Sequence, residues 1–320
     1  MTDKDVTQVV QADAAGIAKA AQVLAAGGLV AVPTETVYGL AARADADDAV
    51  ARIYAAKGRP EFNPLIVHVR DAEHARNFAQ WNAGADAIAK LYWPGPLTLV
   101  LPRRGDARLA DAVTAGLPTV ALRVPAHPAM QALLRQIDFP LAAPSANRSG
   151  FISPTTPAHV LATLDGRIDL ILDAGPCESG VESSILAIRD DGAWQDLRPG
   201  PVDLNAAHLQ LYGSGLGVPD RSAQIEAPGQ LASHYAPGKP VRLNAAEVAQ
   251  DEFLIGFGDI QGDCTLSSSG DLDEAAARLY DCLHRGAASD KSRIAVASVP
   301  ETGVGRAIND RLRRAAAPLA

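Results

Sequence analysis

The chain has 320 residues, of which 48% are apolar and 21% are charged, and its formal net charge is −8 at pH 7. These fractions are typical of a globular protein with one large domain and a small second one. The acidic balance excludes a protein whose main task is to coat nucleic acid, so any basic surface must be local. We expect neither a signal peptide nor a membrane span, because no basic segment precedes an apolar core and no run of about eighteen apolar residues occurs.

The cysteines are Cys177, Cys264 and Cys282, which lie far apart and form no CxxC pair. An odd number of cysteines at such spacings is a poor disulfide framework. A reducing cytoplasm is therefore the simplest expected location.

The first elements follow from caps and apolar runs. Met1–Ala12 is polar and is expected to be loose. Asp13 is a favourable N-cap for a helix that Gly27 ends. The apolar run Leu29–Val32 then predicts a buried strand, which Pro33 ends.

Hydroxyls, cations and an imidazole concentrate in the stretch that follows. A helix pattern ends at Gly58, and the next apolar run, Leu65–Val69, predicts a second strand. In open α/β sheets, ligands collect at the carboxyl ends of strands. The stretch therefore predicts a site for a small anionic ligand. Its polar side chains are Thr34, Thr36, Lys57, Arg59 and His68.

The rest of the chain alternates strands and helices, which indicates an α/β fold. The segment Tyr212–Pro240 is rich in Gly, Pro and Ser and predicts a linker, which includes the glycine-rich Gly213–Gly217. Before it we expect a helical region over Ala72–Tyr92, strands at Leu97–Leu101 and Thr119–Val124, a helix at His127–Gln136, a strand at Leu141–Ala143, a helix at Pro157–Leu164, and strands at Leu170–Asp173 and within Gly180–Ile188. After it we expect strands at Val241–Leu243, Phe253–Phe257 and Arg293–Val299, a helix from Leu272 to Leu283 and a helix at Val304–Ala315.

Five cations lie beside Pro or Gly turns, and arginine offers a planar fork that suits phosphate or carboxylate. A single such side chain is more often simply solvated, whereas five in one domain favour an anion site. A set of hydroxyl and amide side chains could recognise the same ligand or could only stabilise turns. The cations are Lys57, Arg59, Arg123, Arg148 and Arg198, and the hydroxyl and amide set is Thr34, Thr36, Ser145, Asn147, Ser149, Ser153, Ser183 and Ser184.

The histidines do not predict a metal centre. No pair has HExxH spacing, and the chain has no acidic calcium-loop pattern, no GxSxG elbow and no GxxxxGK[ST] loop. His68 lies in an apolar strand, where it is either a core histidine or a ligand contact. The others on predicted helices are expected at the surface: His74, His127, His159, His208 and His284.

An ordered set of longer motifs resembles the Sua5/YciO/YrdC family. The match covers nearly the whole chain, and its later motifs resemble the linker and C-terminal domain of the Sua5-type members. The motifs are PTETVYGL at Pro33–Leu40, KGRP at Lys57–Pro60, PLIVHV at Pro64–Val69, WPGPLTLVL at Trp93–Leu101, LRVP at Leu122–Pro125, PSANRSG at Pro144–Gly150, ES at Glu182-Ser183, LRPGP at Leu197–Pro201, HYAP at His234–Pro237 and GVGRAINDRLRRAA at Gly303–Ala316.

The resemblance implies a YrdC-like twisted open α/β sheet over residues 8–210, a linker over 211–240 and a small Rossmann-like α/β Sua5 domain over 241–320. The implied activity is that of a nucleotidyltransferase, which joins L-threonine, bicarbonate and ATP, with Mg²⁺, into L-threonylcarbamoyladenylate and pyrophosphate. The product feeds the N6-threonylcarbamoyl modification of adenosine 37 in tRNA, through downstream threonylcarbamoyl-transfer proteins. We expect a cytoplasmic monomer.

The motif match also implies roles for single residues. Lys57 and Arg59 form the KxR pair, expected to face phosphates and to act in catalysis. The residues expected around L-threonine are Thr36, His68, Arg123, Ala143 and Ser183. Those expected to line ATP are Arg59, Asn63, Thr119, Ser145, Asn147, Ser153, Arg198, His234 and Tyr235. No protein-bound metal is expected.

Two departures from the family pattern concern the linker and the ES motif. The linker reads PGQLASHYAP, without the basic residues that similar linkers often carry before the histidine, and Ser184 and Ala187 stand where Thr and Asp are often found.

Two other functions are compatible with parts of this pattern. One is a non-catalytic RNA-binding module of the same fold, against which the acidic balance and the scarcity of aromatic residues argue. The other is a carbamoyl-transferring maturation factor, whose extra zinc-finger and acylphosphatase-like segments are not visible in this sequence.

Overall fold

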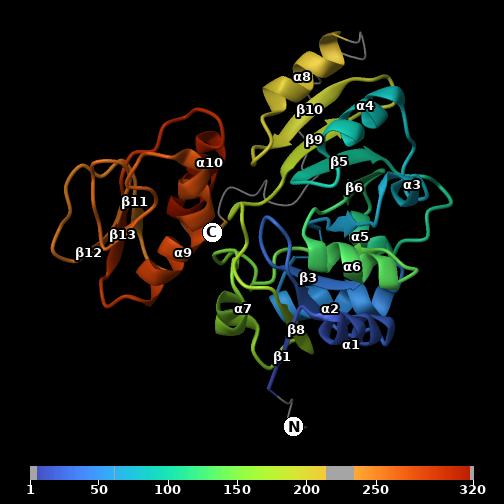
Figure 1. Cartoon of the computed structure of the whole chain (residues 1–320), viewed down its shortest axis with the longest axis horizontal. Coiled ribbons are helices and arrows are strands. Elements are labelled where there is room, and N and C mark those ends of the chain that lie inside the picture. Colours follow the sequence, from blue (N-terminus) through green and yellow to red (C-terminus); the bar gives the residue numbers. More distant parts are fainter. Residues whose placement is uncertain (1–5, 61, 214–233, 318–320) are drawn as a thin grey trace.

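The computed structural model describes residues 6–60, 62–213 and 234–317, and within them the chain forms two α/β parts (Figure 1). The larger part is built on a ten-stranded mixed sheet and the smaller on a four-stranded parallel sheet, which confirms the predicted fold class. The spatial order of the large sheet is β1 (Gln8–Gln11), β8 (Leu170–Asp173), β2 (Val30–Val32), β3 (Gly39–Arg43), β7 (Leu141–Ala142), β4 (Ile66–His68), β6 (Thr119–Arg123), β5 (Leu97–Pro102), β9 (Ser184–Ile188) and β10 (Trp194–Arg198).

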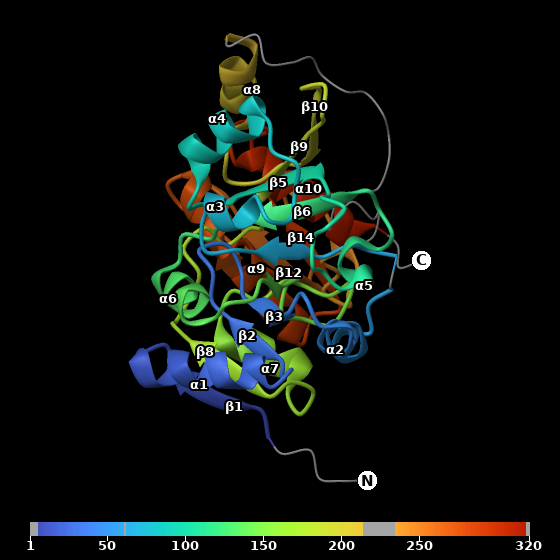
Figure 2. The same cartoon turned by 90° about the vertical axis from the view of Figure 1, so that its right-hand side faces the viewer.

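Helices cover both faces of the large sheet, and the strands alternate their side chains between the faces. Leu40, Val67 and Leu122 share one apolar cluster with α2, whereas Ala41 packs in another cluster with α1 and α6. Figure 2 shows α1 and α6 on one side of β2 and β3, and α2 on the other. The helices of this part are α1 (Ala14–Ala25), α2 (Asp47–Lys57), α3 (Ala72–Ala75), α4 (Ala83–Tyr92), α5 (Asp111–Thr114), α6 (Pro128–Gln136), α7 (Pro157–Leu164) and α8 (Leu204–Gly213).

Local signals explain several helix ends. The Asp13 carboxylate accepts a hydrogen bond from the Gly16 amide at 2.8 Å, so Asp13 is the N-cap of α1 as predicted. Gly58 ends α2 with φ of 61°, in the left-handed region that glycine tolerates. This cap turns the chain directly after Lys57 and directs the following residues back toward the sheet.

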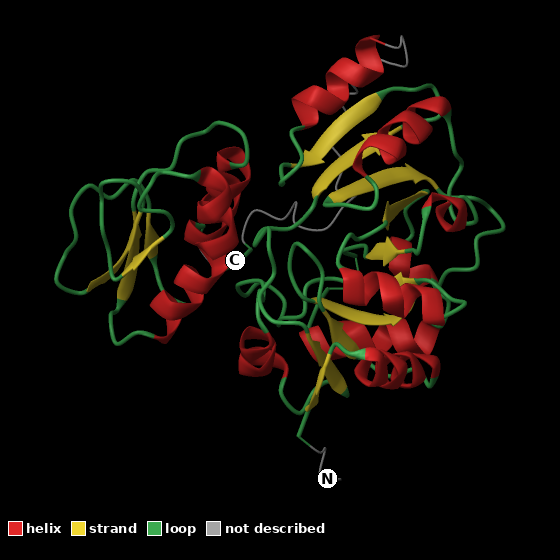
Figure 3. Cartoon of the chain, viewed as in Figure 1, coloured by secondary structure: helices red, strands yellow, loops and turns green. Residues whose placement is uncertain are grey.

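The smaller part places its helices against the larger part and its sheet on the outside (Figure 3). Val37, Ile152, Val181 and Tyr235 pack into the apolar cluster of these helices, so the two parts share a core. A Cβ on Gly180 would lie 2.4 Å from the backbone of Ala276 and Ala277, so only glycine allows this approach. The elements are β11 (Val241–Arg242), β12 (Glu252–Gly256), β13 (Cys264–Thr265), β14 (Arg293–Val296), α9 (Leu272–Ala288) and α10 (Gly305–Ala316), with β11-β14-β12-β13 as the strand order.

Some predicted elements are wrong. The polar stretch before Asp13 contains an edge strand, β1, which pairs with β8 in parallel. The helical region over Ala72–Tyr92 is two helices, α3 and α4, with a non-helical segment between them. The strands β3, β10 and β13 and the helix α5 were not predicted, and α8 was expected only as a helix around His208. The linker segment over 214–233, with Gly217 and the PGQLAS stretch, lies outside the described residues.

The cysteine prediction is also wrong, because Cys264 and Cys282 form a disulfide that joins β13 to α9. Cys177 is a free, buried thiol. The pairing depends on packing between a strand and a helix, which the spacing in the chain does not reveal.

Among the helices formed by the described residues, none combines the length and the apolar character needed to cross a bilayer.

The histidines are less exposed than predicted, and two of them join the two parts. His74 is buried. His159 and His284 stack with ring centroids 3.9 Å apart, and His284 Nε2 lies 3.1 Å from the Ser153 carbonyl oxygen. Burial and the neighbouring His159 lower the pKa of His284 to about 4. The folded protein therefore holds this imidazole neutral.

We predict that His284→Gln weakens the pH dependence of stability. The unfolded chain binds a proton at His284 below about pH 6.5, while the folded chain does so only near the lowered pKa, so stability falls as pH drops through this window. The stability advantage of the wild type over the variant should shrink by about 2 kcal/mol between about pH 7.5 and pH 5. Urea unfolding at both values measures it, and an unchanged difference would contradict the prediction.

Candidate active site

A cavity of about 50 Å³ lies where several connections of the large sheet meet the segment at 234–235. Its lining combines three arginines, two histidines and several hydroxyl groups from stretches far apart in the sequence. The residues are Thr34, Thr36, Val37, Gly39, Arg59, Ile66, His68, Arg123, Ala143, Pro144, Ser145, Glu182, Ser183, Arg198, His234 and Tyr235. A cavity of this volume holds a few water molecules, so a larger ligand requires its walls to separate.

The register of two neighbouring strands places a histidine and an arginine of the cavity side by side. His68 of β4 pairs with Arg123 of β6 in the parallel ladder. Because Val67 and Leu122 point into the core on the opposite face, His68 and Arg123 both point toward the cavity. Both side chains are buried, at 3% and 4% exposure.

Arg123 is held by the connection between β2 and β3. Its Nη1 donates to Thr36 Oγ1 at 2.9 Å, and its Nη2 forms an ion pair with Glu35 Oε1 at 2.7 Å, with angles outside hydrogen-bond geometry. Thr34 Oγ1 lies 2.8 Å from Thr36 Oγ1. Burial alone would raise the pKa of Glu35, but the charge of Arg123 keeps it below its usual value. Glu35 therefore stays ionised and fixes the guanidinium.

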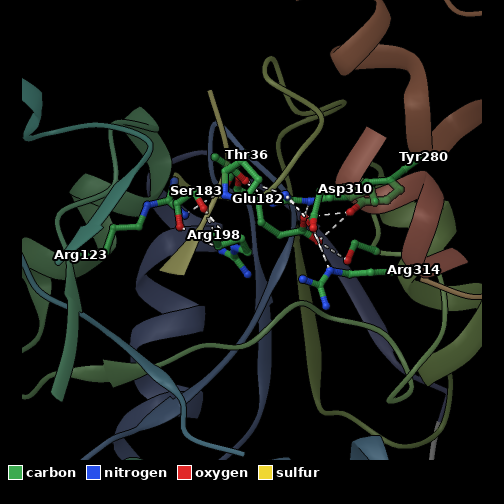
Figure 4. A network of polar contacts seen from close by, with 11 residues as sticks. Thr36, Arg123, Glu182, Ser183, Arg198, Tyr280, Asp310 and Arg314 are labelled. Atoms are coloured by element: carbon green, nitrogen blue, oxygen red, sulfur yellow. Dashed lines mark hydrogen bonds and ion pairs between the residues drawn. The ribbon is translucent and has the colours of Figure 1, made fainter. Parts of the chain in front are cut away.

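Ser183 and Arg198 form a second arm of the site (Figure 4). Arg198 donates through Nε and Nη2 to the Ser183 carbonyl oxygen at 3.1 and 3.0 Å, and Nη2 also reaches Ser183 Oγ at 3.2 Å. Ser183 Oγ lies 2.8 Å from Thr98 Oγ1. Burial lowers the pKa of Arg198, because a buried positive charge is unfavourable unless an anion lies beside it.

Lys57 and Arg59 follow the end of α2 and are both buried. Lys57 Nζ donates to the carbonyl oxygens of Ser145, at 2.6 Å, and Asn147. Arg59 donates through Nε to the Asn63 carbonyl oxygen at 3.3 Å and through Nη2 to that of Pro64 at 3.0 Å. Burial lowers the pKa of Arg59 to about 10 and, with the charge of Arg59, brings the pKa of Lys57 well below its usual value.

Unpaired polar atoms mark the cavity as a place for a polar ligand. His68 Nδ1 and His234 Nδ1 are buried and have no hydrogen-bond partner among the described residues. Burial lowers the pKa of both histidines to about 3, so both rings are neutral at pH 7. Buried polar atoms normally have partners, so these two are available to a bound molecule.

The structure brings most of the predicted site residues into this lining. Among the described residues, Thr36, His68, Arg123, Ala143, Ser183, Arg59, Ser145, Arg198, His234 and Tyr235 line the cavity, while Lys57, Asn63, Thr119, Asn147 and Ser153 lie outside the lining. Arg148 is exposed, and its guanidinium carbon lies 5.8 Å from the Phe151 ring centroid.

Two carboxylates of the site were not predicted as site residues. Glu35 lies in the PTETVYGL motif and Glu182 in the ES motif, so the sequence places both among recognised residues but gives no sign of their partners. Glu182 contacts Tyr280 and Arg311, which are about 100 or more residues further along the chain. Only the packing of the smaller part reveals these contacts.

We predict that Glu35→Gln destabilises the protein by about 3 kcal/mol, because it leaves the buried guanidinium of Arg123 without its ion pair. The matched control is Asp106→Asn, which breaks the exposed pair with Arg104 and should cost much less stability, because water screens that pair. Denaturant unfolding measures both losses. Equal losses of stability in the two variants would show that burial does not make the Glu35–Arg123 pair more important for stability than an exposed pair.

Comparison with known proteins matches both parts of the chain. Residues 22–200 match the profile of the Sua5/YciO/YrdC family, which carries the description "Telomere recombination". Residues 203–317 match the profile described as "Threonylcarbamoyl-AMP synthase, C-terminal domain".

Relatives of nearly full length are similar. The threonylcarbamoyl-AMP synthase of Bacillus subtilis is 41% identical over 98% of this chain and 96% of its own. That of Pyrococcus abyssi is 36% identical over 90% of each chain. The crystal structure of P. abyssi Sua5 complexed with L-threonine has a TM-score of 0.85 and 34% identity over 97% of both chains. The chain therefore belongs to the Sua5/YciO/YrdC family, in the form that carries the C-terminal region of the threonylcarbamoyl-AMP synthases.

Proposed function

We propose that this protein is a threonylcarbamoyl-AMP synthase, which makes L-threonylcarbamoyladenylate and pyrophosphate from L-threonine, bicarbonate and ATP. The observation that carries the proposal is the single cavity shared by Arg123, His68 and Ser183 on one side and Arg59 and Arg198 on the other. The near-full-length relatives named for this activity support it. The product serves the threonylcarbamoyl modification of tRNA.

In this proposal L-threonine binds beside β4 and β6. Arg123 offers its guanidinium to the threonine carboxylate, and the fixed Glu35–Arg123 pair sets the orientation of that fork. Thr36 and Ser183 offer hydroxyl groups, and Ala143 supplies an apolar wall. His68 is neutral, so its free Nδ1 can exchange a hydrogen bond with the amine or hydroxyl of threonine without adding charge.

ATP takes the arm that holds Arg59, Ser145 and Arg198, with His234 and Tyr235 over the nucleotide. Because the cavity is small, the segment at 234–235 must move away from the wall for ATP to enter. Lys57 Nζ can reach the phosphates only if it gives up its hydrogen bonds to two carbonyl oxygens. We assign it one of two roles: it stabilises negative charge in the transition state, or it holds the PSAN segment in place. Asn63, Asn147, Ser153 and Thr119 lie outside the lining of the cavity.

The chemistry needs positioning rather than an enzyme nucleophile. The neutral threonine amine and bicarbonate form a carbamate and release water, which carries the amine proton and one bicarbonate oxygen. One carbamate oxygen then attacks the α-phosphorus of ATP. The bond from the α-phosphorus to the bridging oxygen breaks, and pyrophosphate leaves with that electron pair. Arg59, Arg123 and Arg198 stabilise the negative charge that gathers at this centre. The buried cavity keeps water from a labile carbamate.

Mg²⁺ fits this site as a companion of ATP rather than as a resident metal. The described residues contain no group of three or more His, Cys, Asp or Glu that could hold an ion. Magnesium bound to nucleotides often has phosphate oxygens and water as most of its ligands. When bound, the ion neutralises part of the triphosphate charge beside the arginines.

We propose that residues 8–210 carry out catalysis, that 211–240 form the linker and that 241–320 have a supporting role.

A cytoplasmic location agrees with the use of ATP and tRNA. The Cys264–Cys282 disulfide is unusual for that compartment, where disulfides are rare. The RNA-binding alternative is weakened because the cavity arginines are buried, with exposures of 8% or less, and cannot form an open phosphate-binding surface.

The reaction itself gives the first test. Purified protein with ATP, Mg²⁺ and bicarbonate should release pyrophosphate only when L-threonine is added, because the carbamate of threonine is the attacking group. A coupled pyrophosphate assay and mass detection of the adenylate measure it. Pyrophosphate release at the same rate without threonine would refute the proposed reaction.

Arg59→Ala should lower turnover by about a hundredfold or more, because a charge beside the transferring phosphorus is lost. Arg148→Ala is the matched control: it removes an arginine that is also next to a turn, but one that is exposed outside the cavity, and should leave turnover near the wild-type value. Circular dichroism and thermal melts test that both variants fold. If the two variants are equally active, the proposed role of Arg59 is wrong.

A further inference from the structure

Glu182 is a buried carboxylate in the cavity wall whose partners come mostly from the smaller part of the chain (Figure 4). Tyr280 of α9 donates its hydroxyl to Glu182, with oxygen–oxygen distances of 2.8 and 3.0 Å. Arg311 of α10 donates Nε to Glu182 Oε2 at 3.1 Å. Ser153 Oγ donates to Oε1 at 2.6 Å.

Arg311 joins two segments of the site that are distant in sequence. Besides the carboxylate, its Nη1 donates to the Pro199 carbonyl oxygen at 2.6 Å, and its Nη2 lies 3.4 Å from the Glu182 carbonyl oxygen. The residues next to these contacts are Ser183 and Arg198, which line the cavity. Arg311 itself is fully buried and does not line the cavity. It can therefore act on a ligand only through Glu182 and through the positions of its neighbours.

The charge of Glu182 would oppose an anionic ligand if it were unpaired. The carboxylate faces the cavity that also holds Arg59 and Arg198, the cations assigned to ATP. A buried carboxylate without a partner either repels a nearby phosphate or takes up a proton. The guanidinium of Arg311, which also pairs with Asp310 Oδ2 at 3.1 Å, offsets this charge from behind the wall, so the arginines in the cavity stay available to the nucleotide.

We propose that Arg311 is a positioning residue through which the smaller part of the chain neutralises Glu182 and so permits ATP to bind. The proposal rests on the function proposed above. It explains why α10 docks a buried arginine against the site instead of an apolar side chain. The steric fit of Gly180 against α9, two residues before Glu182, holds the same segment in place.

The test compares Arg311→Met with the double variant Glu182→Gln, Arg311→Met. Calorimetric titration with ATP alone, in Mg²⁺ buffer without threonine, should show about tenfold weaker binding or more for Arg311→Met, because the uncompensated carboxylate faces the phosphates. Adding Glu182→Gln removes that carboxylate and should return the Kd to within about threefold of that of Glu182→Gln alone. The Kd for L-threonine should change much less.

Three further variants separate charge from packing. Arg311→Lys keeps the charge and should bind ATP within about threefold of the wild type. Tyr280→Phe removes a neutral donor and should weaken ATP binding less than Arg311→Met does. Arg313→Met removes an exposed arginine two residues along α10, paired with Glu301, and should leave ATP binding unchanged.

The outcomes distinguish this inference from the proposed function. If Arg311→Met weakens ATP and threonine binding equally and Glu182→Gln restores neither, Arg311 only docks the two parts and the inference is wrong. Arg311→Lys binding ATP about tenfold or more weakly than the wild type would also overturn it, and this comparison stands even if Arg311→Met proves too unstable to measure. Wild-type protein that binds ATP but makes no adenylate would contradict the proposed reaction and leave this comparison valid. Wild-type protein that binds no ATP would overturn both.

Discussion

The site depends on an excess of buried positive charge. Burial disfavours a charged group unless ion pairs or hydrogen bonds compensate for the lost water. Here backbone carbonyl groups do much of this work, and burial still lowers the pKa values of three of the cations: Lys57, Arg59 and Arg198. An anion that enters the cavity relieves this imbalance, so the excess of buried positive charge favours the binding of a polyphosphate. The cations are Lys57, Arg59, Arg123, Arg198 and Arg311, against the carboxylates of Glu35 and Glu182.

The two carboxylates fix the positions of individual arginines but are too few to neutralise all of the buried cations. Glu35 and Arg123 both belong to the larger part and form an ion pair there, which fixes the proposed threonine subsite. Glu182 pairs across the interface with Arg311, so the nucleotide arm depends on how the smaller part docks. Alternation along β4 and β6 supplies the remaining geometry, because it turns His68 and Arg123 away from the core and toward the cavity. In this way a mixed sheet and a docked pair of helices build one site from distant residues.

The sequence predicted what local chemistry determines and missed what packing determines. Asp13 and Gly58 correctly predicted one end each of α1 and α2, because a capping residue interacts with the backbone of the adjacent helical turn. The strand β1 was missed because it is only four residues long, has a glutamine at each end, and is mostly exposed at a sheet edge. Motif resemblance identified most of the cavity lining. It could not identify Arg311, which lies in a helix with several other arginines and differs from exposed Arg313 only in what it faces. The Cys264–Cys282 pair was likewise hidden, because only the contact between β13 and α9 brings the two thiols together.

The central claim is that one cavity holds both substrates among these buried cations. A crystal structure of the full chain with L-threonine and a non-hydrolysable ATP analogue tests it most directly. The account predicts the threonine carboxylate on Arg123, with His68 and Ser183 beside the amino acid, and the phosphates beside Arg59 and Arg198, with the α-phosphorus next to the threonine nitrogen. Either ligand bound away from this cavity, or the two bound at sites too far apart to react, would contradict it.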